Sequence, residues 1–138
     1  MASKVFLDAN IILDLTLKRE GYIHAKQIIA SAINGQITLY TSSSIIHIIG
    51  YWLTKTYGSN KAKNLLLALL DDVQILETNH ETIVNSLHSK IIDIEDAIQY
   101  QTAIYHKLDG FISRDRQLQK ISTSTVPVYT PEEFLKTF

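Results

Sequence analysis

Cysteine is absent from this chain of 138 residues. Its absence excludes a disulfide framework, a thiolate zinc site, an iron–sulfur cluster and a cysteine nucleophile. No apolar run approaches the roughly 18 residues that a membrane-spanning helix needs. The apolar residues Val5–Leu7 also follow the first residues directly, without the longer apolar segment of a secretory signal. These absences predict a cytoplasmic protein that does not contact a membrane.

Glycine and proline are scarce, with five and two residues. The glycines match neither G-x-G-x-x-G nor G-x-x-x-x-G-K-[ST], which excludes the usual dinucleotide and P-loop phosphate sites. No G-x-S-x-G elbow offers a serine nucleophile. Because neither a repeat nor a linker interrupts the chain, residues 1–138 are predicted to form one domain.

Short apolar runs rich in β-branched residues alternate with segments of helical periodicity. Five strands are predicted, at Val5–Leu7, Ile37–Tyr40, Val73–Leu76, Phe111–Ile112 and Val126–Tyr129. This alternation indicates an α/β fold with three layers, in which helices cover both faces of a mostly parallel five-stranded sheet. Among the helices, Asn10 is predicted to cap one over Ile11–Leu17, and Ser59 or Asn60 to cap one over Ala62–Leu70.

Carboxylates follow the predicted strands at the positions where α/β sheets bind ligands. Asp8 ends the first strand, Asp115 comes shortly after the fourth, and Asp93 and Asp96 open the helix that precedes the fourth. In an open α/β sheet, ligands bind beyond the carboxyl ends of the strands where the strand order reverses. If the first and fourth strands are neighbours, these acids face one crevice.

Two of these acids can also be explained by local structure alone, without a binding role. Asp93 suits the first turn of a helix, and Asp115 suits an exposed turn. Asp8 is different, because a carboxylate that ends a buried strand needs a partner. Several acids in one crevice repel each other unless a cation binds between them, and ligation by oxygen alone favours Mg²⁺ or Mn²⁺ over Zn²⁺.

Three motifs in order make the chain similar to a known family. They are VFLDANIILD at residues 5–14, EDAIQYQTA at 95–103 and GFISRD at 110–115. Together they resemble the PIN-domain proteins, and among these the small single-domain ribonucleases of the VapC toxin type. The resemblance implies that Asp8, Asp96 and Asp115 are the catalytic, metal-binding acids, with Asn10 and Ser113 as hydrogen-bonding support.

The same resemblance implies a biochemical activity and partners. The expected reaction is hydrolysis of RNA phosphodiester bonds by a Mg²⁺- or Mn²⁺-dependent endoribonuclease. Toxins of this type pair with an antitoxin protein and commonly form homodimers. Arg114 and Arg116, on either side of Asp115, are candidates for contacts to RNA phosphates, although solvated surface charge explains them equally well.

One position departs from the family pattern. After the second strand the family carries an acid, usually glutamate, in a pattern like Ser-x-x-x-x-Glu, and this chain has His47 there. Histidine can bind a metal ion or orient a water molecule, but it adds no negative charge, so Asp93 would have to compensate. The alternative is a catalytically weakened PIN-like module that binds RNA or protein. A phospho-acceptor receiver domain is disfavoured, because only one acid follows the first strand.

The overall charge of −1 comes from 13 basic and 14 acidic residues. Such a balance at first disfavours a nucleic-acid partner. Five of the acids, however, belong to the predicted crevice: Asp8, Asp93, Glu95, Asp96 and Asp115. The rest of the surface is therefore mildly basic, which is compatible with RNA once a metal ion occupies the crevice.

Overall fold

A computed structural model describes residues 2–121 and 125–138, and its centre is a five-stranded sheet. The strands are β1 (Ser3–Leu7), β2 (Ile37–Ser42), β3 (Val73–Leu76), β4 (Gly110–Ile112) and β5 (Val128–Tyr129). Their order is β3-β2-β1-β4-β5, and every neighbouring pair is parallel. The predicted α/β class and the five predicted strands are confirmed.

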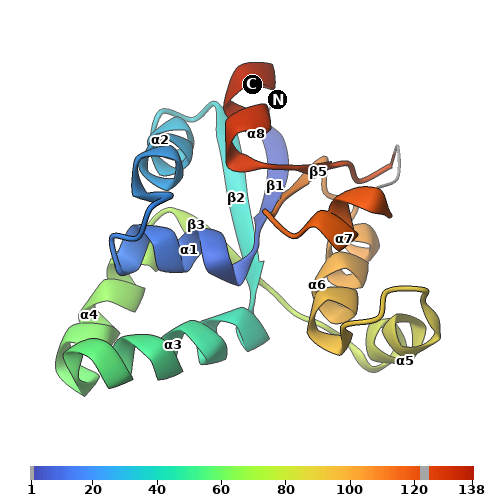
Figure 1. Cartoon of the computed structure of the whole chain (residues 1–138), viewed down its shortest axis with the longest axis horizontal. Helices are drawn as coiled ribbons and strands as arrows, with labels where there is room; N and C mark the ends of the chain where they lie inside the picture. Colours follow the sequence, from blue (N-terminus) through green and yellow to red (C-terminus); the bar gives the residue numbers. More distant parts are fainter. Residues whose placement is uncertain (1, 122–124) are drawn as a thin grey trace.

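Helices cover both faces of this sheet. They are α1 (Ala9–Thr16), α2 (Tyr22–Ile33), α3 (Ser43–Tyr57), α4 (Ser59–Leu70), α5 (His80–His88), α6 (Ile94–Tyr105), α7 (Arg116–Lys120) and α8 (Pro131–Thr137). Figure 1 shows α1 to α4 on one side and α5 to α7 on the other. That division follows from right-handed crossovers, because the chain first moves from β1 towards β3 and then returns to β4 and β5.

Several predicted boundaries need correction. Asp8, and not Asn10, is the N-cap of α1, because its side chain accepts a hydrogen bond from the backbone N–H of Ala9. The N-cap of α4 is Gly58 instead of Ser59 or Asn60, and its φ of 85° suits glycine. Strand β5 begins two residues later than predicted, and α7 was not predicted at all.

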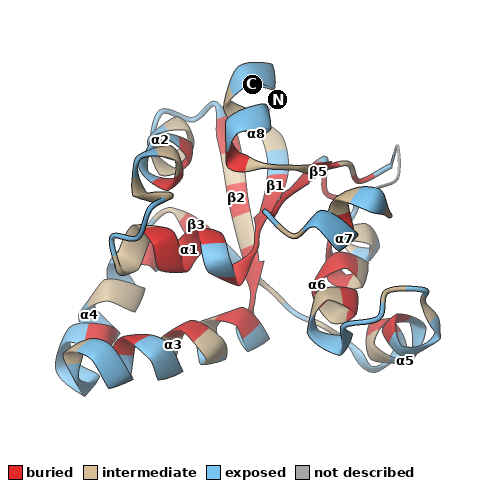
Figure 2. Ribbon diagram, viewed as in Figure 1, coloured by how far each residue is buried: buried red, intermediate tan, exposed pale blue. Residues whose placement is uncertain are grey.

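The core lies where β1 and β4 run side by side. Val5, Phe6 and Leu7 are at most 1% exposed, and the rings of Phe6 and Phe111 stack with centroids 4.8 Å apart. Figure 2 shows buried residues along these strands and on the inner faces of α1, α3 and α6. Within the described residues, no helix has both the length and the apolar character that a membrane span requires.

The strand order reverses at β1. This strand pairs with β2 on one side and with β4 on the other, with Leu7 opposite Ile112. The pairing continues one residue further, where the backbone N–H of Asp8 donates to the carbonyl oxygen of Ile112 at 3.2 Å. The predicted neighbourhood of the first and fourth strands is therefore confirmed, and Asp8 and Ser113 emerge together beyond them.

Candidate active site

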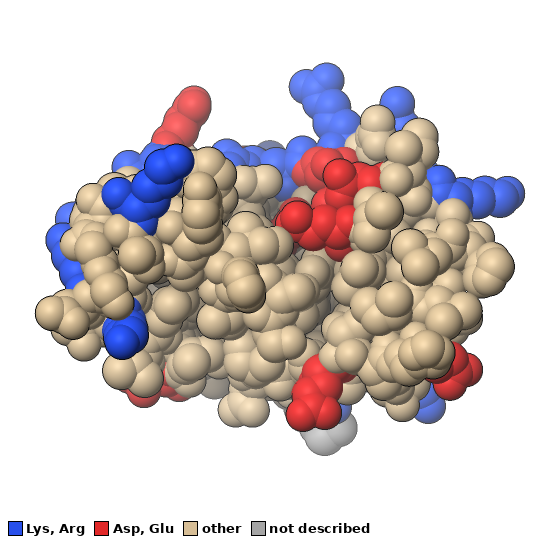
Figure 3. Space-filling model, turned by 90° about the horizontal axis from the view of Figure 1, so that it is seen from below, with Lys and Arg blue, Asp and Glu red and all other residues tan. Residues whose placement is uncertain are grey.

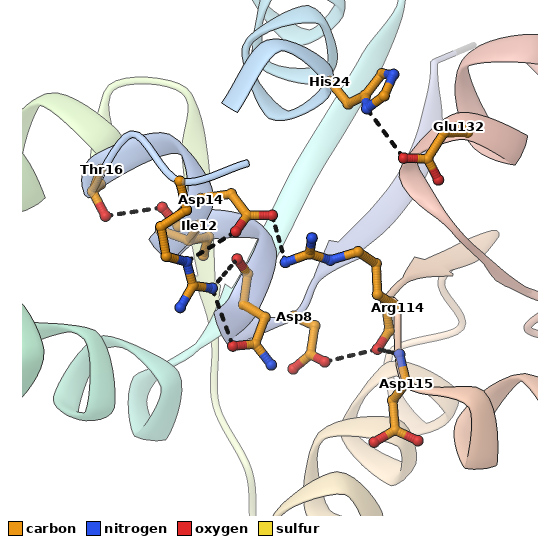
Figure 4. Close-up of polar contacts among 11 residues, drawn as sticks. Asp8, Ile12, Asp14, Thr16, His24, Arg114, Asp115 and Glu132 are labelled. Atoms are coloured by element: carbon orange, nitrogen blue, oxygen red, sulfur yellow. Dashed lines mark hydrogen bonds and ion pairs between the residues drawn. The ribbon is translucent and has the colours of Figure 1, made fainter. Parts of the chain in front are cut away.

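Asp8 and Ser113 form the floor of the candidate site. The carboxylate of Asp8 is 6% exposed and accepts hydrogen bonds from the N–H of Ala9 and the hydroxyl of Ser113, both at 2.8 Å. The oxygen of the same hydroxyl accepts the backbone N–H of Asp115 at 3.0 Å. Figure 4 shows Asp8, which follows β1, near Asp115, which lies in the segment after β4. One buried serine thus links the residues that follow β1 and β4.

Asp115 is oriented by the short helix that it caps. Its Oδ1 accepts the backbone N–H groups of Gln117 at 2.8 Å and Leu118 at 3.1 Å. Leu118 is 1% exposed and anchors α7 to the core. The capping interactions use Oδ1, and the Asp115 side chain also lies within hydrogen-bond reach of the Asp96 carboxyl group.

Helix α6 brings the remaining acids. Asp93 is its N-cap and accepts the backbone N–H of Asp96 at 2.9 Å. Ala97 and Tyr100 of α6 are buried in the core, and Asp96, in the first turn of the same helix, is half-buried at the edge of the crevice. Figure 3 shows acidic side chains gathered in one cluster beside a hollow on this face of the molecule.

The pKa values of Asp8 and Asp96 are raised, first by burial and then by the neighbouring carboxylates. Burial, together with the negative charges of Asp8, Asp115 and Asp93, raises the pKa of Asp96 to about 7. Burial also raises the pKa of Asp8, against the hydrogen bonds from Ser113 and Ala9, and the charges of Asp115 and Asp93 add to this rise. These shifts show that the protein by itself leaves the negative charge uncompensated.

Glu95, which the sequence places in the crevice without a specific role, belongs to the same electrostatic group. Its pKa is raised by partial burial and then by the charges of Asp8 and Asp93. The sequence signal was its position next to Asp96 in the first turn of α6, where acids are common for helix stability alone.

A hard divalent cation fits this donor set. The side chains offer carboxylate oxygens only, which is the chemistry that Mg²⁺ and Mn²⁺ prefer. In residues 2–121 and 125–138, however, no three His, Cys, Asp or Glu side chains are arranged as a closed set of ligands for one ion. The crevice therefore has the right chemistry, and completing a coordination shell requires water, substrate oxygens or small side-chain movements.

His47 occupies a surface position on α3. It is exposed on α3, where it lines a surface hollow with Gly50, Tyr51, Thr54 and Lys55. In the part of the chain that the structure describes, no hydrogen bond or ion pair joins it to a carboxylate of the crevice. The position expected to carry a further acid thus contributes no negative charge.

Two other predicted site residues belong to a separate network. The guanidinium of Arg114 pairs with the carboxylate of Asp14 at 2.6 Å, and the side-chain oxygen of Asn10 accepts from Arg19 at 3.3 Å. Arg116 is exposed on α7. Asp14 had no predicted role. The available signal was an acid in the last turn of an apolar helix, where the helix dipole disfavours it.

Comparisons with known proteins agree with this architecture. The family model described as "PIN domain" matches residues 4–117, and the chain belongs to the PIN-domain family. No match was found among curated protein sequences.

Solved structures of VapC toxins share the fold. The toxin–antitoxin complex VapBC2 of Rickettsia felis, bound to a promoter DNA fragment, matches with a TM-score of 0.69 and 15% identity over 92% of this chain and 98% of that one. A toxin–antitoxin complex from Klebsiella pneumoniae gives 0.68 and 22% over 92% and 97%. Mycobacterium tuberculosis VapC20, described as a toxin that cleaves the sarcin–ricin loop, gives 0.62 and 13% over 78% and 86%.

Proposed function

We propose that this protein is a metal-dependent ribonuclease that hydrolyses RNA phosphodiester bonds and acts as the toxin of a toxin–antitoxin pair. The observation that carries the proposal is the crowding of Asp8, Asp96 and Asp115 where the strand order reverses. Membership in the PIN-domain family supports it, since PIN nucleases generally use divalent metal ions. VapC20, one of the proteins with this fold, is described as cleaving RNA.

The chain's own residues would hold and orient the reacting groups. Asp8, Asp96 and Asp115 would bind Mg²⁺ or Mn²⁺, with Asp93 as a further carboxylate close by. The bound ion would supply an activated water and offset charge on the phosphate. Ser113 would keep Asp8 and Asp115 in register through its two hydrogen bonds, and Asn10 would support the same segment from the side.

Contacts to RNA phosphates would come from the basic residues beside the crevice. Arg116 is exposed on α7 directly after Asp115. Arg114 pairs with Asp14 through Nη2 only, and its Nε and Nη1 have no hydrogen-bond partner among the described residues. Both arginines therefore have N–H groups that could donate to phosphate oxygens. Such contacts do not depend on the base sequence of the RNA.

An antitoxin and a second copy of the chain are the proposed protein partners. Helix α3 exposes Tyr51 by 58% and Trp52 by 46%, whereas Ile45 and Ile49 on the same helix are fully buried in the core. Exposed aromatic side chains of this kind are typical of protein interfaces. The Rickettsia felis and Klebsiella pneumoniae structures are complexes of a toxin with its antitoxin, which supports this assignment. Such a pair would act in the cytoplasm.

The decisive test is RNA cleavage by the wild-type protein and by Asp8→Asn. We expect cleavage that requires Mg²⁺ or Mn²⁺, is lost with a chelator, and falls by at least about 10²-fold in Asp8→Asn. Lys63→Ala, a change at an exposed residue on α4, is the matched control. Undiminished cleavage by Asp8→Asn would contradict the assignment.

His47 motivates the second candidate, a PIN-like module that binds RNA or protein without cleaving it. The absence of a closed set of metal ligands among the described residues favours this alternative. Mn²⁺ added to the purified protein separates the two functions. A nuclease should gain thermal stability and cleave RNA, whereas a non-catalytic module should do neither.

A further inference from the structure

A second buried carboxylate lies on the helix that Asp8 caps. Asp14, in the last turn of α1, is 1% exposed, and both of its oxygens are ion-paired. Oδ1 lies 3.0 Å from Nε of Arg19, and Oδ2 lies 2.6 Å from Nη2 of Arg114. Two guanidinium groups compensate one carboxylate at a helix end whose dipole would otherwise repel it.

Arg19 reaches Asp14 because the chain turns back on itself after α1. Lys18 adopts a left-handed conformation with a φ of 53°, and the backbone N–H of Arg19 donates to the carbonyl oxygen of Asp14 at 3.0 Å. This is the bond that closes a helix in a Schellman motif. Nη2 of Arg19 also donates to the carbonyl oxygen of Asn10 at 3.1 Å. Arg19 thereby links Asp14 to Asn10, which lies in the first turn of α1, two residues after Asp8.

Arg114 connects Asp14 to the other acid-bearing segment. It stands between Ser113, which binds Asp8, and Asp115, which caps α7. In Figure 4 the Arg114 side chain runs from that segment across to Asp14. The ion pair therefore fixes the direction in which the backbone leaves β4.

Gly21 leaves the space in which this pairing forms. A Cβ atom added there would lie 2.2 Å from Oδ2 of Asp14 and 3.3 Å from Nη1 of Arg114. Its φ of −80° is open to any residue, so glycine is needed for space and not for backbone conformation. Any side chain at position 21 would displace the carboxylate or the guanidinium.

We propose that Asp14 is a positioning residue of the active site, which holds the Asp8 and Asp115 segments in register through Arg19 and Arg114. The inference rests on the proposed ribonuclease function and adds a residue to it that touches neither metal nor RNA. Groups that orient metal-binding residues from behind commonly change metal affinity or activity by about 10- to 100-fold when they are removed.

The test uses Asp14→Asn in the full chain, with Mn²⁺ alone as the first probe. Isothermal titration calorimetry should show weaker Mn²⁺ binding than in the wild type, by about 10-fold or more. Cleavage of an RNA oligonucleotide should show a fall in kcat of about 10- to 100-fold, with KM changed by less than about threefold. A residue that only stabilises the fold would lower the melting temperature without changing Mn²⁺ affinity.

Gly21→Ala is the second variant, because it disturbs the same contacts without removing a charge. It should weaken Mn²⁺ binding and kcat in the same direction as Asp14→Asn. His24→Ala is the matched control. It removes an ion pair between α2 and α8, with His24 Nδ1 3.1 Å from an oxygen of Glu132, and should leave Mn²⁺ affinity and kcat unchanged.

Three outcomes distinguish the positioning role of Asp14 from a purely structural one and from failure of the proposed function. Weakened Mn²⁺ binding in Gly21→Ala and in Asp14→Asn, or in Gly21→Ala alone if Asp14→Asn does not fold, supports the positioning role. Mn²⁺ affinity and kcat within about twofold of the wild type in a folded variant overturn it. A wild-type protein that neither binds Mn²⁺ nor cleaves RNA overturns the proposed function, and the positioning role falls with it.

Discussion

Helix α1 carries two buried aspartates in opposite electrostatic environments. Asp14, at the end of the helix, has a guanidinium group on each oxygen. Asp8, at its start, has hydrogen bonds from Ser113 and Ala9 but no Lys or Arg within salt-bridge distance among the described residues, and its charged neighbours are acids. The protein compensates the charge of Asp14 with its own guanidinium groups and leaves the charge of Asp8 without a cationic partner.

The comparison separates an acid whose charge the protein compensates from an acid whose charge it does not. Burial alone does not distinguish them, because Asp8 is 6% and Asp14 is 1% exposed. The difference lies in the partners that the tertiary structure supplies. Uncompensated charge in a crevice costs stability, and such a cost persists where it serves binding or catalysis.

The largest loss of stability is expected from removing the carboxylate of Asp14, which is paired with two guanidinium groups. Asp14→Ala should lower the free energy of unfolding by about 2–3 kcal/mol, somewhat less than for a fully buried pair because the two guanidinium groups can regain water. Asp8→Asn should raise the stability of the metal-free protein, because it removes a buried charge while its single amide oxygen can still accept from the backbone N–H of Ala9. Chemical denaturation measures both. Equal losses in the two variants would contradict the distinction.

A smaller loss of stability is expected from removing the hydroxyl of Ser113, which joins Asp8 to the backbone of Asp115. Ser113 is fully buried, and its hydroxyl contacts both Asp8 and the backbone of Asp115. Ser113→Ala should cost about 1–2 kcal/mol of stability. It should also reduce RNA cleavage, because Asp8 and Asp115 are then no longer joined by a common partner. Ser31→Ala, which removes an exposed bond to Gln27, is the control and should change neither property.

The raised pKa of Asp96 predicts that the stability of the protein depends on pH. Its pKa of about 7 in the folded protein lies above the ordinary value of 3.8. The folded state therefore binds more protons than the unfolded state between these values, so the stability contributed by this group is present at low pH and is lost as pH rises towards 7. Because Asp96 is half exposed, we expect a loss of only about 1 kcal/mol.

Thermal melting of the metal-free protein from pH 5 to pH 8 measures this dependence. Asp96→Asn should flatten the profile and raise the melting temperature at pH 8 by roughly 3–5 °C. Asp109→Asn is the matched control, because Asp109 lies at the opposite end of β4, where its carboxylate accepts from the backbone of Lys4. An unchanged profile in Asp96→Asn would show that the acids are farther apart in solution.

The smallest effect comes from the turn that brings Arg19 to Asp14. Lys18→Gly should stabilise the protein by about 0.5–1 kcal/mol, because a φ of 53° is strained for lysine and free for glycine. Lys26→Gly, inside α2, should instead destabilise by about 1 kcal/mol. A loss of stability in Lys18→Gly would indicate that the lysine side chain itself supports the Asp14 network.

Much of the fold could be predicted because its signals are local. Apolar β-branched runs predicted the five strands within one or two residues. The acid-bearing segments were also predictable, since Asp8 and Asp115 directly follow strands. Helix α7 was missed because it has only five residues and starts from an aspartate that also suits a simple turn.

Predictions about individual side chains were less secure. Arg114 was assigned because it lies beside Asp115 in the sequence, and Asn10 because of the family resemblance, yet both contact the Asp14 network. Asp14 looked like an ordinary polar residue in an apolar helix. Its partners come from a turn five residues later and from a loop a hundred residues away, and no local pattern encodes such a contact.

The sequence alone determined the α/β class, the parallel strands and the acids that end them, because hydrophobic periodicity and strand ends are written in neighbouring residues. Only the tertiary structure decided which carboxylates are compensated. The strand order β3-β2-β1-β4-β5 brings the segment after β4 beside α1, so that Arg114 meets Asp14 while Asp115 faces Asp96. Charge compensation depends on distances across the fold, and folding alone sets those distances.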